Sequence, residues 1–190
     1  MNHSLVIADN LSYKINESKL FSSLSFQLNK GECLHIKGSN GSGKSTLIRI
    51  ILGITNPSKG EIKTNIDEGI CYLGHKNALK SYLSVEDNIM LMGLLKHDKL
   101  KKYLETLSLK KFLDIKVANL SYGQQKKLAL LRIFMGNSNL IILDEPFVGL
   151  DLENQNILSA FLNNELIKEK GIIFTSHIEC NINAKTLKID

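Results

Sequence analysis

The segment GSNGSGKS, residues 38–45, contains three glycines followed directly by a lysine and a serine. It fits the pattern GxxxxGK[ST] and lies between an apolar stretch typical of a strand and one typical of a helix. Glycines let backbone N–H groups face phosphate oxygens, while the lysine reaches the β- and γ-phosphates and the serine hydroxyl ligates Mg²⁺. We therefore predict a phosphate-binding loop made by Gly38, Ser39, Asn40, Gly41, Ser42, Gly43, Lys44, Ser45 and Thr46.

Two carboxylates end the apolar segment LIILDEP, residues 140–146. In an open α/β sheet, ligands collect at the carboxyl ends of the strands, so Asp144 and Glu145 are expected beside the phosphate loop. Their expected roles differ. Asp144 suits the Mg²⁺ shell, together with Ser45, and Glu145 suits the base that polarises an attacking water.

A second segment, NLSYGQQKKLALLRIF at residues 119–134, also looks like a phosphate cradle. It places Ser121, Gly123 and Gln124 directly before an apolar stripe at helical spacing. A helix N-terminus with small polar residues suits an anion. The pattern raises the question of why one chain needs two such sites.

The elements that must position these residues are strands and helices in alternation. Apolar segments at residues 4–8, 22–28, 32–38, 139–146 and 171–177 read as strands, and residues 45–53 read as a helix. From Val85 to Lys116, Leu and Lys recur at three- and four-residue spacing, which predicts helix throughout. The alternation predicts one α/β domain over residues 1–190, with a parallel-sheet core (1–74 and 137–190) and an all-helical insertion (75–136).

Composition excludes several classes of protein. The chain has 190 residues, 43% of them hydrophobic, and no stretch long and apolar enough for a membrane span, so we expect a cytosolic globular domain. The three cysteines and five histidines show no metal-ligand or haem-attachment spacing.

Positive charge is concentrated in one region of a chain whose net charge is +5. Between Lys96 and Arg132 there are ten Lys or Arg residues and three acidic ones. A solvated helical face, acidic lipid head groups or an acidic partner would each suit this run. Nucleic acid is a weaker alternative, because no aromatic interleaving or binding motif accompanies the charge.

Five segments occur in the order GSNGSGKST, LSYGQ, LIILDEP, VGLD and TSHIE. Together they resemble the nucleotide-binding domains of ABC transporters over essentially the whole chain. The resemblance implies a P-loop ABC ATPase that uses ATP and Mg²⁺. It also implies a parallel-sheet core, an N-terminal antiparallel β layer and an inserted α-helical subdomain.

The resemblance also assigns roles to single residues. LSYGQ resembles the signature motif, in which Ser121, Gly123 and Gln124 would hold the γ-phosphate bound to another subunit, so that a homodimer would sandwich two ATPs. Asp151 resembles the aspartate that links the two sites, and His177 resembles the switch histidine that orients the hydrolytic water. The implied catalytic set is therefore Lys44, Glu145 and His177, and Tyr13 resembles the aromatic residue that stacks on adenine.

His75 departs from the family pattern, which has glutamine at this position. An imidazole can still bond to a water or to the γ-phosphate, but it is shorter and can titrate, which leaves open whether His75 senses Mg²⁺. The dipeptide GH at this place, with LFSSLSFQL and LSYGQQKKLALLR, resembles the CcmA family, the ATP-binding subunits of haem exporters in c-type cytochrome biogenesis. That resemblance implies a CcmB-like integral membrane partner, docked on the helical subdomain, and a peripheral position on the cytoplasmic face of the inner membrane.

Other functions remain possible at this point. The chain could serve another ABC exporter, for a lipid, peptide or drug, or act as a soluble ABC ATPase on ribosomes or DNA. A P-loop kinase for small molecules is a further enzyme class, but it would leave LSYGQ and His177 unexplained.

Overall fold

The computed structural model describes residues 4–66 and 69–189. Its first layer is an antiparallel sheet in the order β2-β1-β4, built from β1 (Ser4–Ile15), β2 (Ser18–Asn29) and β4 (Lys59–Thr64). Val6 pairs with Leu28 on β2 and with Thr64 on β4. The N-terminal antiparallel layer is therefore confirmed, and its first two strands are longer than the sequence suggested.

The second layer is a parallel sheet that carries the phosphate loop and the carboxylates. Its order is β5-β6-β7-β3-β8, from β3 (Cys33–Lys37), β5 (Ile70–Leu73), β6 (Leu140–Asp144), β7 (Gly171–Thr175) and β8 (Lys185–Lys188). Every neighbouring pair in this sheet runs parallel. β6 and β7 are buried along their whole length, as expected for central strands covered on both faces.

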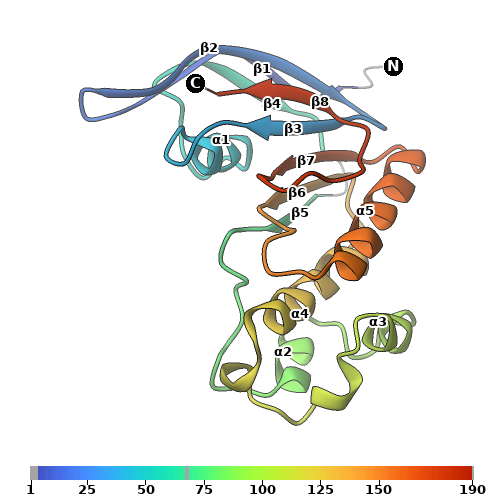
Figure 1. The fold of residues 1–190 in the computed structure, drawn as a ribbon. Helices are drawn as coiled ribbons and strands as arrows, with labels where there is room; N and C mark the ends of the chain where they lie inside the picture. Colours follow the sequence, from blue (N-terminus) through green and yellow to red (C-terminus); the bar gives the residue numbers. More distant parts are fainter. Residues whose placement is uncertain (1–3, 67–68, 190) are drawn as a thin grey trace.

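Alternate residues of the central strands enter two different cores, because successive side chains point to opposite faces of a sheet. Leu140 and Ile142 of β6 pack with α1 (Lys44–Ile51) and with the antiparallel sheet. Ile141 and Leu143 pack into the other core, with α4 (Tyr122–Phe134) and α5 (Leu152–Ile167). Figure 1 shows α1 between the antiparallel layer and the central strands, with α5 on the opposite side.

The expected continuous helix from Val85 to Lys116 is wrong. The structure has α2 (Val85–Leu91), α3 (Leu100–Thr106) and a short 3₁₀ turn η1 (Lys110–Phe112), and a second such turn, η2 (Val117–Asn119), follows. The backbone turns into the left-handed region at Gly93 (φ 72°) and at Ser108 (φ 55°), which ends each helix. The Leu spacing correctly predicted helix within α2 and α3. Residue spacing alone, however, does not show where the backbone turns and a helix ends. These short helices form the lower lobe in Figure 1.

No helix in the parts of the chain that the structure describes combines the length and the apolar character that crossing a bilayer requires.

Candidate functional site

The phosphate loop joins β3 to α1 and depends on its glycines. Gly41 and Gly43 have φ values of 85° and 100°, in the left-handed region that glycine adopts without strain. At Gly38 a side chain would collide with the Ile189 carbonyl and the Ser42 hydroxyl. The Lys44 ammonium folds back across the loop and donates 2.9 Å hydrogen bonds to the carbonyls of Gly38 and Ser39. The loop is thus a compact turn closed by its own lysine.

Asp144, at the end of β6, is held by two hydroxyl groups. The Ser45 hydroxyl at the start of α1 donates to Asp144 Oδ2 at 2.7 Å. The Thr175 hydroxyl at the end of β7 donates to Asp144 Oδ1, also at 2.7 Å. Asp144 is only 3% exposed, so these bonds stabilise the charge of a buried carboxylate. The two residues expected at the metal, Ser45 and Asp144, are therefore brought into direct contact.

Glu145 has a strained backbone and a partly unpaired carboxylate. Its φ is 51°, a left-handed value that is unusual for a non-glycine residue. Its N–H donates to the Thr175 hydroxyl at 2.9 Å, and its Oε2 accepts a 3.3 Å bond from the His177 N–H. Oε1 is buried without a hydrogen-bond partner among the described residues, and His177 Nε2 lies 3.6 Å from it. A carboxylate and an imidazole that lie side by side on the wall of one cavity suit the orientation of a water molecule.

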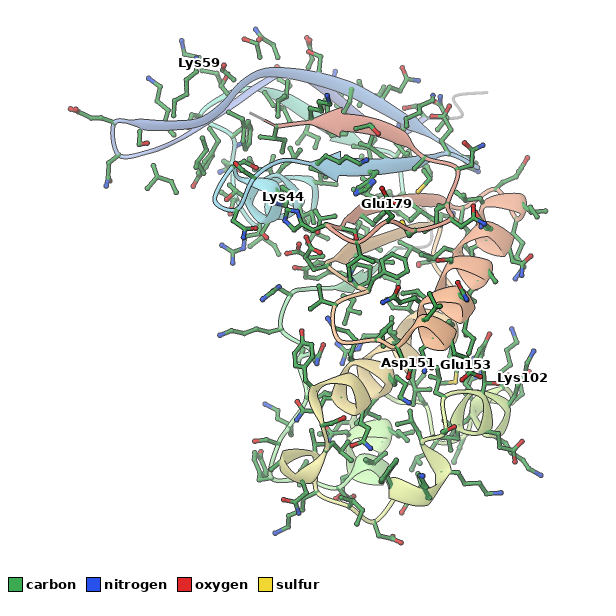
Figure 2. All side chains as sticks on the ribbon, viewed as in Figure 1. Lys44, Lys59, Lys102, Asp151, Glu153 and Glu179 are labelled. Atoms are coloured by element: carbon green, nitrogen blue, oxygen red, sulfur yellow. The ribbon has the colours of Figure 1, made fainter. Side chains whose placement is uncertain are left out.

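His177 connects this carboxylate to the phosphate loop. Its Nε2 lies 3.3 Å from the Lys44 Nζ and 3.1 Å from the Asn40 Oδ1. All these groups face a cavity of about 520 Å³, and His75 also lines it. Figure 2 shows the Lys44 side chain at the edge of the sheet where β6 and β7 end. The full lining comprises Ile15, Leu20, Asn40, Gly41, Gly43, Lys44, Ser45, Thr46, His75, Asp144, Glu145, Val148 and His177.

A separate cavity of about 310 Å³ lies at the start of α4. There the Ser121 hydroxyl accepts from the Gln124 N–H at 3.2 Å, while Gln124 Oε1 accepts from the Ser121 N–H at 2.8 Å, so the pair forms a capping box. Gly123 packs so tightly that a side chain would collide with the Gly149 carbonyl. Ser121, Gly123, Gln124, Lys127, Gly149, Leu150 and Asp151 line the cavity.

Asp151 closes this cavity from the start of α5. Its Oδ1 accepts from the Asn154 N–H at 2.9 Å and from the Asn154 side chain at 2.7 Å, which caps the helix. These hydrogen bonds hold the pKa of Asp151 below its ordinary value. The two cavities share no lining residue, and in Figure 2 Asp151 lies well away from Lys44. One chain therefore does not bring its own Ser121 to its own phosphate loop.

Residues 21–148 match the family described as ABC transporter, which covers more than half of the chain. The chain belongs to the ABC transporter family. Membership confirms the predicted P-loop ABC fold, ATP binding and ATP hydrolysis in a transporter subunit.

Individual relatives of this ABC transporter ATPase match nearly end to end. The cytochrome c biogenesis ATP-binding export protein CcmA of Dechloromonas aromatica is 35% identical, over 95% of this chain and 96% of the relative. The CcmA protein of Legionella pneumophila, strain Lens, is 31% identical over 91% and 92%. A solved ATP-binding subunit of an ABC transporter superposes with a TM-score of 0.80 at 26% identity, covering 92% of this chain and 80% of that one. The predicted resemblance to CcmA is confirmed as a similarity of sequence.

Some residues predicted for the nucleotide site do not line the 520 Å³ cavity, among them Gly38, Ser39 and Ser42 of the phosphate loop. Tyr13 is not among the residues lining the 520 Å³ cavity; its ring stacks on Phe21, with centroids 6.2 Å apart. Ile15 and Leu20 line the cavity instead. The adenine role of Tyr13 stays a prediction.

Two buried residues next to the carboxylates were not identified from the sequence. Thr175 bonds to both Asp144 and Glu145, and its only sequence signal was its place just before Ser176 and His177 at a strand end. Lys126 of α4 is fully buried and reaches the Glu145 carbonyl. No sequence pattern indicated its burial, because a lysine on an amphipathic helix is normally read as exposed.

The donor set suits Mg²⁺ rather than a transition metal. Within residues 4–66 and 69–189, no cluster of three or more His, Cys, Asp or Glu side chains could hold an ion by itself. Mg²⁺ usually takes only one or two protein oxygens and completes its shell with water and phosphate oxygens. The Ser45 hydroxyl next to the Asp144 carboxylate offers that kind of incomplete oxygen set.

Proposed function

We propose that this chain is the ATP-hydrolysing subunit of a CcmAB-type complex that powers haem export or delivery in c-type cytochrome biogenesis. The observation that carries the proposal is the end-to-end similarity to proteins named as CcmA, at 35% and 31% identity. The complex would sit at the inner membrane, with this subunit on the cytoplasmic face and held there by its membrane partner. We also propose that the chain is a single domain with two parts, a core (1–74 and 137–190) and a helical subdomain (75–136).

The residues that line the 520 Å³ cavity would have different roles in ATP hydrolysis. Loop N–H groups and Lys44 would bind the β- and γ-phosphates, with the ammonium exchanging its loop carbonyls for phosphate oxygens. Ser45 and Asp144 would hold Mg²⁺, which neutralises phosphate charge. Glu145, which lines the cavity, would accept a proton from the attacking water. His177, 3.6 Å from that carboxylate, would orient the water and contact the γ-phosphate.

The second cavity would serve a second nucleotide. Ser121, Gly123 and Gln124 would bind the γ-phosphate of an ATP held by the phosphate loop of a partner copy, with Asp151 beside them. A head-to-tail pair related by a two-fold axis would then contain two complete sites. A solved ATP-binding cassette that shares this fold is described as dimeric.

A groove on the helical part suits the membrane partner. Leu91 and Met92 line a cavity of about 350 Å³ together with Ala78, Lys80, Asn88 and Arg132. In the same stretch of the chain the apolar side chains of Tyr82, Met90 and Leu91 are 68%, 55% and 61% exposed, and exposed apolar groups that gather on a surface mark protein–protein contact sites. The Arg132 guanidinium donates to the carbonyls of Asn77 and Ala78, at 3.1 and 3.4 Å, which ties the groove to the segment that follows His75. We propose that a CcmB-like subunit docks here.

A variant without ATPase activity, produced in cells, tests whether the complex acts on haem for c-type cytochromes. Cells that produce Lys44→Ala in place of the natural chain should lose holo-cytochromes c, measured by haem staining of denaturing gels, while b-type cytochromes remain. Normal holo-cytochrome c would contradict the haem role and favour the second candidate, another ABC exporter. Co-sedimentation of the chain with ribosomes or DNA rather than with membranes would favour a soluble ABC ATPase.

A further inference from the structure

Lys126 lies on the second turn of α4 and is 0% exposed. A lysine is almost never fully buried unless its charge is paired, because removing an ammonium group from water is costly. Lys126 nevertheless makes no ion pair within the part of the chain that the structure describes. Its position therefore needs another explanation.

Two groups contact the Lys126 ammonium. Its Nζ donates to the Glu145 main-chain carbonyl at 3.5 Å, and it lies 5.7 Å from the centre of the Tyr122 ring, close enough for a cation–π interaction. Burial holds the pKa of Lys126 below its ordinary value, and the nearby carboxylates of Asp144 and Glu145 offset only part of this effect. The Lys126 side chain therefore ends close to the two acidic residues that end β6.

The Glu145 main chain is held at both of its polar groups. Its N–H donates to Thr175, and its carbonyl accepts from Lys126. Between these two bonds the residue keeps its left-handed φ of 51°, which is unfavourable for a residue with a side chain. The carboxylate itself is held at one oxygen only, by the 3.3 Å bond from the His177 N–H to Oε2, because Oε1 has no partner in the described residues, so the two main-chain bonds also help to set its direction.

The loop after Glu145 is also packed on the start of α4. A side chain at Gly149 would collide with the Tyr122 ring, and a side chain at Gly123 would collide with the Gly149 carbonyl. These contacts, with the Lys126 bond, join residues 145–149 to the first two turns of α4. Figure 1 shows the loop between β6 and α5 passing over the beginning of α4.

We propose that Lys126 is a positioning residue for hydrolysis: its buried ammonium fixes the Glu145 main chain, and thereby the carboxylate, in the orientation that hydrolysis needs. The proposal rests on the proposed role of Glu145 as the base. The residue acts within its own subunit, on the nucleotide bound to the same chain.

Matched mixed dimers test this assignment. In both, one subunit carries Ser121→Arg and the other Lys44→Ala, so that a single complete site remains, built from the first subunit's Lys44 and Glu145 and the second subunit's signature. Lys126→Met, which keeps the length of the side chain and removes the charge, is added to the first subunit in one mixture and to the second subunit in the other. The number of substitutions is the same in both mixtures.

The expected result is asymmetric. With Lys126→Met in the subunit that supplies Glu145, kcat should fall about 10- to 100-fold with little change in KM, because misplacing a catalytic group by about 1 Å can cost that much. With Lys126→Met in the subunit that supplies Ser121, the loss should be several-fold smaller. Equal loss in both mixtures, or loss confined to the second, would overturn the proposal and assign Lys126 a purely structural role in α4.

Controls separate this proposal from the rest of the account. The mixture without a Lys126 change must be active; if it is inactive, the shared-site arrangement fails rather than the role of Lys126. Lys30→Met, a charge removal on an exposed residue outside both cavities, should leave kcat unchanged. If Lys126→Met does not fold, Lys126→Arg replaces it: retained activity in both mixtures supports the need for a buried cation, and a symmetric loss contradicts it.

Discussion

The Thr175 hydroxyl donates a 2.7 Å hydrogen bond to Asp144 Oδ1, so the ends of β7 and β6 are joined through their side chains. The Thr175 hydroxyl oxygen also accepts a 2.9 Å bond from the Glu145 N–H. One buried hydroxyl therefore fixes both acidic residues of the site relative to the sheet. Its loss would leave a carboxylate oxygen and an N–H group unpaired in the interior.

We expect Thr175→Val, which has almost the same shape, to lower ATP hydrolysis about 10- to 100-fold, because both acidic residues lose a fixed partner. The free energy of unfolding should fall by about 1–3 kcal/mol, since buried polar groups become unpaired. Steady-state kinetics and urea unfolding measure the two effects. Thr175→Ser keeps the hydroxyl and should retain most of the activity. Equal activity of the Val and Ser variants would show that the bond is not needed.

Glu145→Gln removes the proposed base and keeps the volume of the side chain. The variant should bind ATP, hydrolyse it at least about 100-fold more slowly, and accumulate as a dimer, because general-base help is worth about 10²–10⁴ in rate. Nucleotide binding, phosphate release and size-exclusion chromatography with ATP measure the three properties. A variant with unaltered turnover would refute the assignment of Glu145.

The ion pairs of Glu165 on α5 should make the free energy of unfolding depend on pH. Its side chain is 4% exposed and accepts 2.6 Å bonds from Lys168 and Lys170. Burial by itself would raise the pKa of Glu165, but the hydrogen bonds and charges of these lysines outweigh it and hold the pKa below its ordinary value of 4.5. Because the folded pKa is the lower one, the stabilisation is complete above about pH 5 and is lost as the pH falls through the folded pKa.

Glu165→Gln should therefore lower the free energy of unfolding at pH 7 by about 1–2 kcal/mol, a figure that allows for screening of the exposed Lys168. The difference from the natural chain should shrink as the pH falls towards about 3. Thermal unfolding across this range is the measurement, and Glu169→Gln, on an exposed neighbour without an ion pair in the described residues, is the control. A difference that stays constant with pH would count against the ion pairs as its cause.

Leu91→Gln tests the proposed docking groove. Leu91 is 61% exposed, so its replacement should leave folding and ATP binding unchanged while weakening co-purification with the membrane subunit about tenfold, as loss of an apolar anchor does. Ile167→Gln is the matched control. Ile167 is also an exposed apolar residue, at 80%, but it lies on α5, outside the proposed helical subdomain. If both variants retain the membrane subunit equally well, docking takes place elsewhere.

The sequence was most informative where backbone chemistry restricts residue type. Glycines at 41 and 43 adopt positive φ, and the apolar run of β6 ends at its two acids, so the phosphate loop and the buried central strand could be predicted by local rules. Ser121 and Gln124 also carry a local signal, since the capping box places them at a helix start.

Other features depend on contacts between distant segments and could not be predicted. Strand β4, KGEIKT, has one partly buried residue among exposed ones and exists because it pairs with β1. The breaks at Gly93 and Ser108 interrupt a spacing that remains helical on either side. Burial of Lys126 follows from the packing of α4 against the loop after β6, which no local pattern reports.

Mixing Lys44→Ala with Ser121→Arg subunits tests the central claim most directly, namely that each copy completes the nucleotide site of the other. Each variant alone should be inactive, because every site in its dimer has one defect. An equimolar mixture should regain roughly a quarter of the natural activity, since random pairing makes half of the dimers mixed and each mixed dimer has one intact site. If the mixture hydrolyses ATP no faster than either variant alone, while mixed dimers are shown to form, the two cavities do not complete one another.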